Sequence, residues 1–153
     1  MKIKNWKLNE IVGKFDILEN NSPEYISHIL MKLNVPVVDT YSPNRSQTEI
    51  DWLKMRNYYS FFTDDKNELL IKGFLKKSLL GQSRNVIITY GWEEPVIIIP
   101  IDLFLQDWEG FVRSKLWEGF IFSEDFELII ECTRDYYIHS NFEIFPNSKN
   151  VVK

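Results

Sequence analysis

The fold is decided by residues 119–145, which read GFIFSEDFELIIECTRDYYIHSNFEIF. Aromatic and β-branched residues dominate this stretch, and two polar segments, SED at 123–125 and TRD at 133–135, interrupt it. Such a pattern is typical of strands that are joined by tight turns. It predicts an antiparallel meander with strands at 119–122, 126–132 and 136–145.

Three-residue connections would set the pairing of these strands. With such connections, Phe122 lies opposite Phe126, and Cys132 lies opposite Tyr136. Because side chains alternate along a strand, this register sorts the apolar residues onto one face. That face holds Phe120, Phe122, Phe126, Leu128, Ile130, Cys132, Tyr136, Ile138, Phe142 and Ile144. The opposite face holds Ile121, Glu127, Ile129, Glu131, Tyr137, His139, Asn141 and Glu143, and we expect it to be more polar and exposed.

The segments before the meander predict two more strands and a helix. Residues 85–90 and 96–99 are β-branched runs separated by GWEEP at 91–95, and they predict a pair of strands. Apolar residues at helical spacing follow, and they predict a helix at about 101–116.

The N-terminal half carries signals for helix starts. Ser22 as an N-cap, with Pro23 at the first helical position, predicts one start, and SQTE at 46–49 and DKNE at 65–68 have the spacing of a capping box. The second helix is expected through 50–55, and the third to end at Gly81 in a left-handed conformation. The expected fold class is therefore α+β. It has a helical N-terminal half and an antiparallel sheet in the C-terminal half, within a single domain at 1–153.

Composition constrains the compartment and the means of stabilisation. Hydrophobic residues make up 44% of the chain, enough for an ordinary core, and Cys132 is the only cysteine. An intrachain disulfide and a cysteine-based zinc site are thereby excluded. The first 15 residues lack the apolar run of a secretory signal, and the apolar run at 96–101 is far short of the ~20 residues that span a membrane. We expect a cytoplasmic protein with no membrane partner.

Motifs for catalysis and cofactor binding are absent from the sequence. No two glycines lie closer than eight residues, which excludes the glycine motifs of phosphate-binding and dinucleotide-binding loops. The only histidines, His28 and His139, lack the spacing of metal ligands. We therefore expect no enzyme activity, no cofactor and no metal, and a small enzyme remains the less favoured alternative.

Two pairings of reactive side chains bear on this expectation. Cys132 and His139 form a conceivable nucleophile and base, but the predicted register places them on opposite faces. Glu127 and Glu131 lie on one strand at a separation of roughly 13 Å, which is too far for a joint acid–base role.

Acidic residues are concentrated in the second half of the chain. Residues 82–145 hold twelve Asp and Glu against four Lys and Arg, whereas residues 1–81 hold ten against twelve. An acidic surface repels nucleic-acid phosphates and attracts basic proteins. The sequence therefore predicts a basic protein partner and no direct binding of nucleic acid.

The stretch WEGFIFSEDFELIIE at 117–131, followed by TRDYYIHSNF at 133–142, resembles the C-terminal meander of small bacterial immunity proteins. These proteins neutralise toxins of the polymorphic or contact-dependent-inhibition type. The resemblance implies a non-enzymatic immunity protein that binds a cognate bacterial toxin, commonly a nuclease with a basic surface. Another cytosolic protein-binding or regulatory module is the alternative.

Partner-binding residues are expected on the polar face of the meander and in its first turn. Exposed acids there would raise the association rate, and a desolvated tyrosine would anchor the complex. The expected set comprises Glu124, Asp125, Glu127, Glu131, Tyr137, His139 and Asn141.

Overall fold

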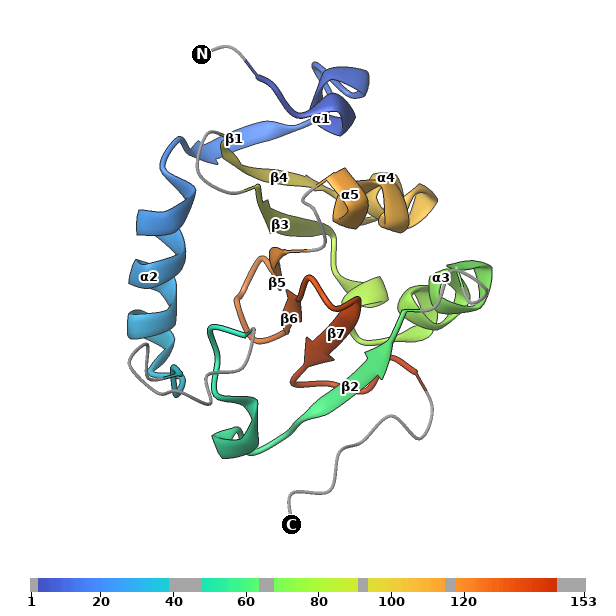
Figure 1. Cartoon of the computed structure of the whole chain (residues 1–153). Coiled ribbons are helices and arrows are strands. Elements are labelled where there is room, and N and C mark those ends of the chain that lie inside the picture. The colour runs from blue at the N-terminus through green and yellow to red at the C-terminus, as the bar shows by residue number, and fades with distance from the viewer. Residues whose placement is uncertain (1–2, 39–47, 64–67, 91–93, 115–117, 146–153) are drawn as a thin grey trace.

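The computed structural model describes residues 3–38, 48–63, 68–90, 94–114 and 118–145. Within these residues, the centre of the molecule is a seven-stranded antiparallel sheet in the order β1-β4-β3-β5-β6-β7-β2 (Figure 1). The strands are β1 (Asp16–Glu19), β2 (Tyr59–Phe62), β3 (Asn85–Thr89), β4 (Val96–Pro100), β5 (Gly119–Ser123), β6 (Ile129–Cys132) and β7 (Tyr137–Ser140).

The two edges of the sheet come from the N-terminal half of the chain. β1 pairs with β4, and β2 pairs with β7. The expected division into a helical N-terminal half and a C-terminal sheet is therefore wrong, although the fold is α+β. Both edge strands have only four residues, and every side chain of β1 is exposed. A strand this short, without alternating burial, leaves no periodic signal in the sequence.

Helices cover both faces of the sheet. They are α1 (Trp6–Glu10), α2 (Ser22–Leu33), α3 (Glu68–Lys77), α4 (Ile101–Gln106) and α5 (Trp108–Ser114), with 3₁₀ turns η1 (Trp52–Lys54) and η3 (Leu80–Gln82). Figure 1 shows α2 on one side of the sheet and α3, α4 and α5 on the other. One core cluster joins α2 and the 48–58 segment to one sheet face, and a larger one joins the remaining helices to the other face.

Two of the expected helices are present, and α2 begins one residue earlier than expected because Asn21, not Ser22, is its N-cap. α2 starts after Asn21, whose side chain accepts a hydrogen bond from the backbone N–H of Glu24. α3 forms most of the third expected helix, whereas the first three residues of its capping box, 65–67, lie outside the described residues. Gly81 is not a left-handed cap. It lies in η3, where a Cβ atom would stand 2.0 Å from the Lys76 carbonyl oxygen, so close packing requires glycine.

The helix expected through 50–55 is replaced by an extended segment and the short turn η1. Ile50 bridges Val37, and the backbone N–H groups of Glu49 and Ile50 donate to the carboxyl group of Glu131. A helix would direct these N–H groups elsewhere and leave the buried Glu131 without its partners. Long-range hydrogen bonding therefore overrides the local capping signal.

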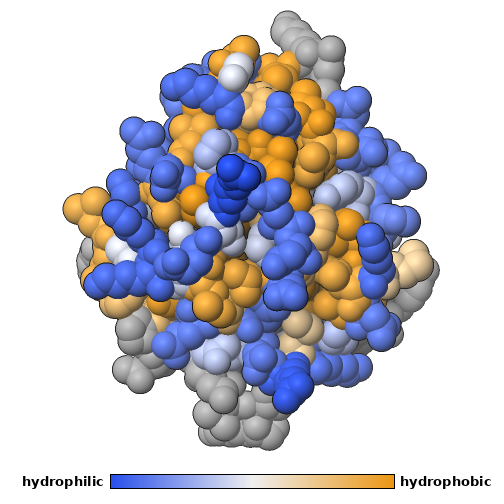
Figure 2. Space-filling model, turned by 180° about the vertical axis from the view of Figure 1, so that it is seen from behind, coloured by the Kyte–Doolittle hydropathy of each residue, from blue (hydrophilic) through white to orange (hydrophobic). Residues whose placement is uncertain are grey.

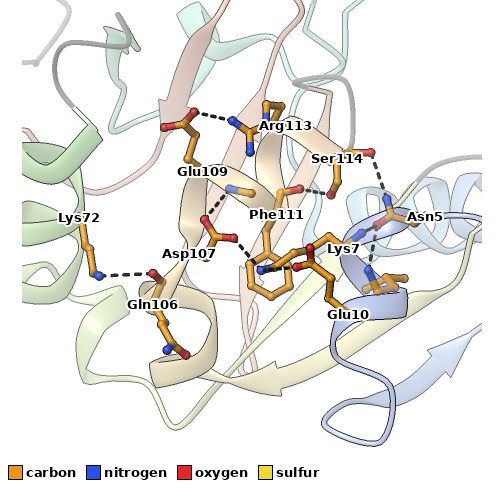
Figure 3. A network of polar contacts seen from close by, with 12 residues as sticks. Asn5, Lys7, Glu10, Lys72, Gln106, Asp107, Glu109, Phe111, Arg113 and Ser114 are labelled. Carbon is orange, nitrogen blue, oxygen red and sulfur yellow. Dashed lines mark hydrogen bonds and ion pairs between the residues drawn. The ribbon is translucent and has the colours of Figure 1, made fainter.

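The helix expected at about 101–116 is two helices, because the chain bends at Asp107. The Asp107 carboxylate accepts from the backbone N–H of Gly110 at 3.1 Å and from Lys7 Nζ at 2.6 Å (Figure 3). It thus caps α5 and ties that helix to α1. Residues 115–117 lie outside the described residues.

The first hairpin of the meander has a longer turn than expected. Phe122 lies opposite Ile129 rather than Phe126, and Phe120 lies opposite Glu131. Phe126 has a positive φ of 61°, and Ser123 Oγ accepts from the backbone N–H of Leu128. These contacts delay the start of β6 until Ile129. The pairing partner of Phe122 is therefore three residues later than expected. A shift by an odd number of residues exchanges the two faces of one strand, so the expected faces of β5 and β6 do not match.

The second hairpin pairs Cys132 with Ile138 instead of Tyr136. Tyr136 has a φ of 66° and closes a tight turn with Thr133, which explains the shift of two residues. An even shift leaves the relative faces of the two strands unchanged. As a result, Ile121, Ile130, Cys132 and Ile138 face the larger cluster, while Phe120, Phe122 and Ile129 face α2. Both sheet faces are apolar, contrary to the expected polar face.

Candidate protein-binding surface

The structure separates the seven expected partner-binding residues into three places. Glu124, Asp125, Glu127 and Asn141 lie at the β5–β6 turn end of the meander, and Tyr137 lies at the opposite end, where β7 begins. Glu131 and His139 lie between these ends and are buried. The residues therefore do not form one exposed surface, and the expected exposure of Glu131 and His139 is wrong.

Glu131 is a structural anchor. Its carboxyl group accepts hydrogen bonds from Glu49 N at 2.6 Å, Ile50 N at 3.2 Å and Trp52 Nε1 at 2.9 Å. Burial raises the pKa of Glu131 to about 7, although the three donors oppose this shift. The residue fastens the 48–52 segment onto the sheet.

His139 lies beside Glu131 on the neighbouring strand and belongs to a layer of stacked rings. Its ring stacks on Trp52 and Tyr58, and the Tyr58 hydroxyl lies 3.0 Å from Nδ1. Burial lowers the pKa of His139 to about 4, so the neutral ring is the form near pH 7. Cys132 faces the other side of the sheet, which separates the thiol from this imidazole.

The polar residues of the β5–β6 turn hold the turn together. Asp125 accepts hydrogen bonds from Ser123 Oγ and from the backbone N–H of Glu127, and these bonds lower its pKa. Asn141 accepts from the backbone N–H of Ile129 and donates to the Glu127 carbonyl oxygen. Glu124 accepts from Asn85. Glu127 is exposed and remains available for long-range electrostatics.

Tyr137 belongs to a cluster that the sequence pattern did not reveal. Phe62, Tyr136 and Tyr137 have exposed fractions of 49%, 47% and 38%, and we name these three residues the aromatic edge. The Phe62 ring lies 5.5 Å from that of Tyr137 and 6.5 Å from that of Tyr136. Phe62 is on the outermost strand and opposite Tyr137, so only the β2–β7 pairing brings these rings together.

The aromatic edge rests on the buried ring layer. Tyr137 stacks on His139 at 6.0 Å, and His139 in turn stacks on Tyr58 and Trp52. Rings held in this way lose little conformational freedom when a partner covers them, which favours binding. The exposed rings therefore form a preorganised surface.

Acidic side chains surround the meander. Residues 118–145 carry seven acids and a single base, Arg134, which pairs with Glu118 at 3.0 Å. All of these acids except Glu131 are exposed. A basic partner would consequently be attracted toward the meander, which carries acids at both of its ends and bears the aromatic edge at one of them.

Other exposed apolar residues are scattered over the molecule, among them Ile17 and Leu18 on β1 and Leu69 and Leu70 on α3. Figure 2 shows the face opposite to that of Figure 1, where hydrophobic areas are divided by hydrophilic side chains. Scattered apolar side chains are ordinary on protein surfaces. The aromatic edge is distinguished by the mutual contacts of its rings.

Among the described residues, no group of three or more His, Cys, Asp or Glu side chains is placed to hold a metal ion. No helix in the described ranges is both long and apolar enough to cross a membrane. Neither a protein-family model nor a curated protein matches this chain.

Proposed function

We propose that this chain is a protein-binding domain of the immunity type, which inhibits a basic toxin domain and docks it through the aromatic edge. The observation that carries the proposal is the contact among three exposed rings on an edge strand and its neighbour. Aromatic residues dominate the energetics of protein interfaces because they bury much apolar area at a small entropic cost.

The edge strand adds a second feature that suits a partner protein. β2 terminates the sheet in the described residues, and one side of its backbone faces away from β7. The acids of 118–145 provide complementarity to a basic partner and the aromatic edge provides apolar contact. Electrostatic attraction mainly raises the association rate, whereas buried rings slow dissociation.

The test is co-expression with the C-terminal domain that the adjacent upstream gene encodes. We expect a complex in size-exclusion chromatography and protection of cells from the toxicity of that domain. Tyr137→Ala and Phe62→Ala should each accelerate dissociation by about tenfold or more, because a central aromatic contributes ~2 kcal/mol. Leu18→Ala, a truncation of an exposed side chain at the other edge of the sheet, is the matched control.

A complex that forms without protection from toxicity would favour a regulatory module over an immunity protein. The absence of any complex, or equal dissociation rates for Tyr137→Ala and Leu18→Ala, would contradict docking through the aromatic edge.

Charge variants test the electrostatic part of the proposal. Glu127→Lys combined with Glu143→Lys changes two exposed acids, so the fold should be retained. Association should become slower and less dependent on salt, while the dissociation rate changes little. Reversal of Glu131 is unsuitable because that side chain is buried. Unchanged association kinetics at low salt would contradict electrostatic attraction by this surface.

A further inference from the structure

A cavity of about 570 Å³ opens at one end of the sheet, apart from the aromatic edge. It is bounded by the end of β3, the start of β5 and the end of β6, together with residues at the starts of α1 and α2. Its volume lies in the range of small-molecule sites, ~300–1,000 Å³. None of the three residues of the aromatic edge lines it.

Glu94 is one of the residues that line this cavity, and its carboxyl group is unusual. The residue is only 7% exposed, and its Oε1 accepts a hydrogen bond of 2.7 Å from the backbone N–H of Lys4. The other oxygen, Oε2, is buried without a hydrogen-bond partner in the part of the chain that the structure describes. A buried acceptor without a donor is rare and destabilising in native proteins. A ligand with N–H groups would remove that penalty.

The charge balance of the cavity wall selects the sign of such a ligand. Four carboxyl groups line it, those of Glu49, Glu94, Glu118 and Glu131, against the cationic side chains of Lys4 and Arg134. Arg134 is paired with Glu118, and Glu131 is occupied by its three N–H donors. An anion placed here would face an excess of acids, and a neutral apolar ligand would leave Oε2 of Glu94 unsatisfied.

Aromatic side chains in the wall suit the body of an organic cation. Trp6, Tyr90 and Phe120 line the cavity. The ring of Trp6 already holds the guanidinium group of Arg113 at 5.7 Å, so this indole is in a cation–π contact. A carboxylate beside aromatic rings is a combination that recognises ammonium and guanidinium groups.

We propose that this cavity binds a small organic cation, a guanidinium or primary ammonium group on a short apolar body, whose N–H groups donate to Oε2 of Glu94. This site is independent of the function proposed above. The same chemistry occurs in a free amine or guanidine and in an arginine or lysine side chain of a partner protein.

Calorimetric titration with butylguanidinium chloride tests the proposal, and butylurea serves as the neutral analogue of similar shape. We expect butylguanidinium to bind at least about tenfold more tightly, because a hydrogen bond between charged groups is stronger than a neutral one. No binding at ~10 mM, a concentration that reveals affinities of ~1 mM, would overturn the proposal. Equal binding of butylurea would overturn it as well.

Glu94→Gln is the decisive variant, because its amide oxygen can still accept from Lys4 N–H while Oε2 is replaced by a donor group. Affinity for butylguanidinium should fall about tenfold or more. Glu143→Gln makes the same change in net charge at an exposed position outside the cavity and should leave affinity unchanged. Equal loss in both variants, or loss in neither, contradicts a role for Glu94. If Glu94→Gln fails to fold, the comparison of butylguanidinium with butylurea on the unmodified protein still tests the proposal.

The peptide acetyl-Gly-Arg-Gly-amide distinguishes the two sources of the cation. Binding as tight as that of butylguanidinium, or tighter, assigns the site to an arginine of a partner, and tighter binding of butylguanidinium assigns it to a free metabolite. Tyr137→Ala should leave the affinities for butylguanidinium and for the peptide unchanged. Ligand binding in the cavity and protein docking through the aromatic edge are therefore tested separately.

Discussion

At the scale of single residues, Glu131 and His139 have opposite effects on stability as pH changes. They are directly paired across β6 and β7, and both are buried. Burial raises the pKa of Glu131 from 4.5 to about 7 and lowers that of His139 from 6.5 to about 4. The stability that Glu131 contributes is full below pH 4.5 and is lost as pH rises to about 7. The contribution of His139 is full above pH 6.5 and is lost as pH falls to about 4.

The two effects partly cancel in the unmodified protein, and single substitutions should separate them. In Glu131→Gln the contribution of this pair to the free energy of unfolding should increase with pH between about 4 and 6.5, by roughly 3 kcal/mol, because His139 is then the one member of the pair that titrates. In His139→Gln it should decrease between 4.5 and about 7, by a similar amount. Urea unfolding at a series of pH values measures both slopes. Glu109, whose pKa is also raised to about 7, titrates in every variant, so Glu131→Gln is compared with Glu131→Gln/His139→Gln. Equal pH dependence of these two variants would show that His139 does not resist protonation.

At the scale of elements, the junction of α1 with α5 depends on Lys7. This side chain is buried, pairs with Asp107 at 2.6 Å and lies 5.0 Å from the centroid of the Phe111 ring (Figure 3). Glu10 offers a second, longer ion pair at 3.3 Å. The Asp107 side chain is 41% exposed whereas that of Lys7 is 9% exposed. Water can therefore solvate the charge of Asp107 when its partner is removed, but not that of Lys7.

This difference predicts an asymmetry between two variants. Asp107→Ala removes the cap of α5 and leaves a buried ammonium group with Glu10 alone, so it should destabilise the protein by about 2 kcal/mol. Lys7→Met keeps the apolar packing and leaves a carboxylate that water can solvate, so its effect should stay within ~1 kcal/mol. Chemical denaturation of the two variants provides the comparison. A larger loss in Lys7→Met would refute the proposed dependence.

At the scale of the whole molecule, the N-terminal half completes the sheet and covers one of its faces. β1 and β2 form the edges, and α2 with the 48–58 segment covers Ile87, Phe120 and Phe122. A chain without residues 1–63 would expose these three side chains. It would also expose the edges of β4 and β7, which β1 and β2 otherwise cover. Exposed apolar faces and unpaired edges favour aggregation.

A fragment of residues 68–153 should therefore fail to fold by itself, although it contains most of the strands. We expect no cooperative thermal transition, and size-exclusion chromatography should show aggregates in place of a monomer. The full chain, prepared in parallel, is the control. A monomeric fragment with a cooperative transition would mean that the C-terminal residues form an independent core.

Local patterns in the sequence determined the elements whose signals lie within a few neighbouring residues. The α2 helix, the α3 helix and the β3–β4 pair follow from such patterns, although the N-cap of α2 is Asn21 and not Ser22. Capping and alternation act over short distances, so a single chain segment contains the information.

Only the tertiary structure decided what depends on contacts between distant segments. The 48–52 segment is extended because its N–H groups find Glu131, up to 82 residues away. The β5–β6 turn is also held by Asn141, which lies beyond β7 and bonds the backbone of Glu127 and Ile129. Phe62 and Tyr137 meet only because β2 adds to the far edge of the sheet. Such pairings follow from the free energy of the whole assembly, in which buried polar groups must find partners, and no local window of the sequence contains that condition.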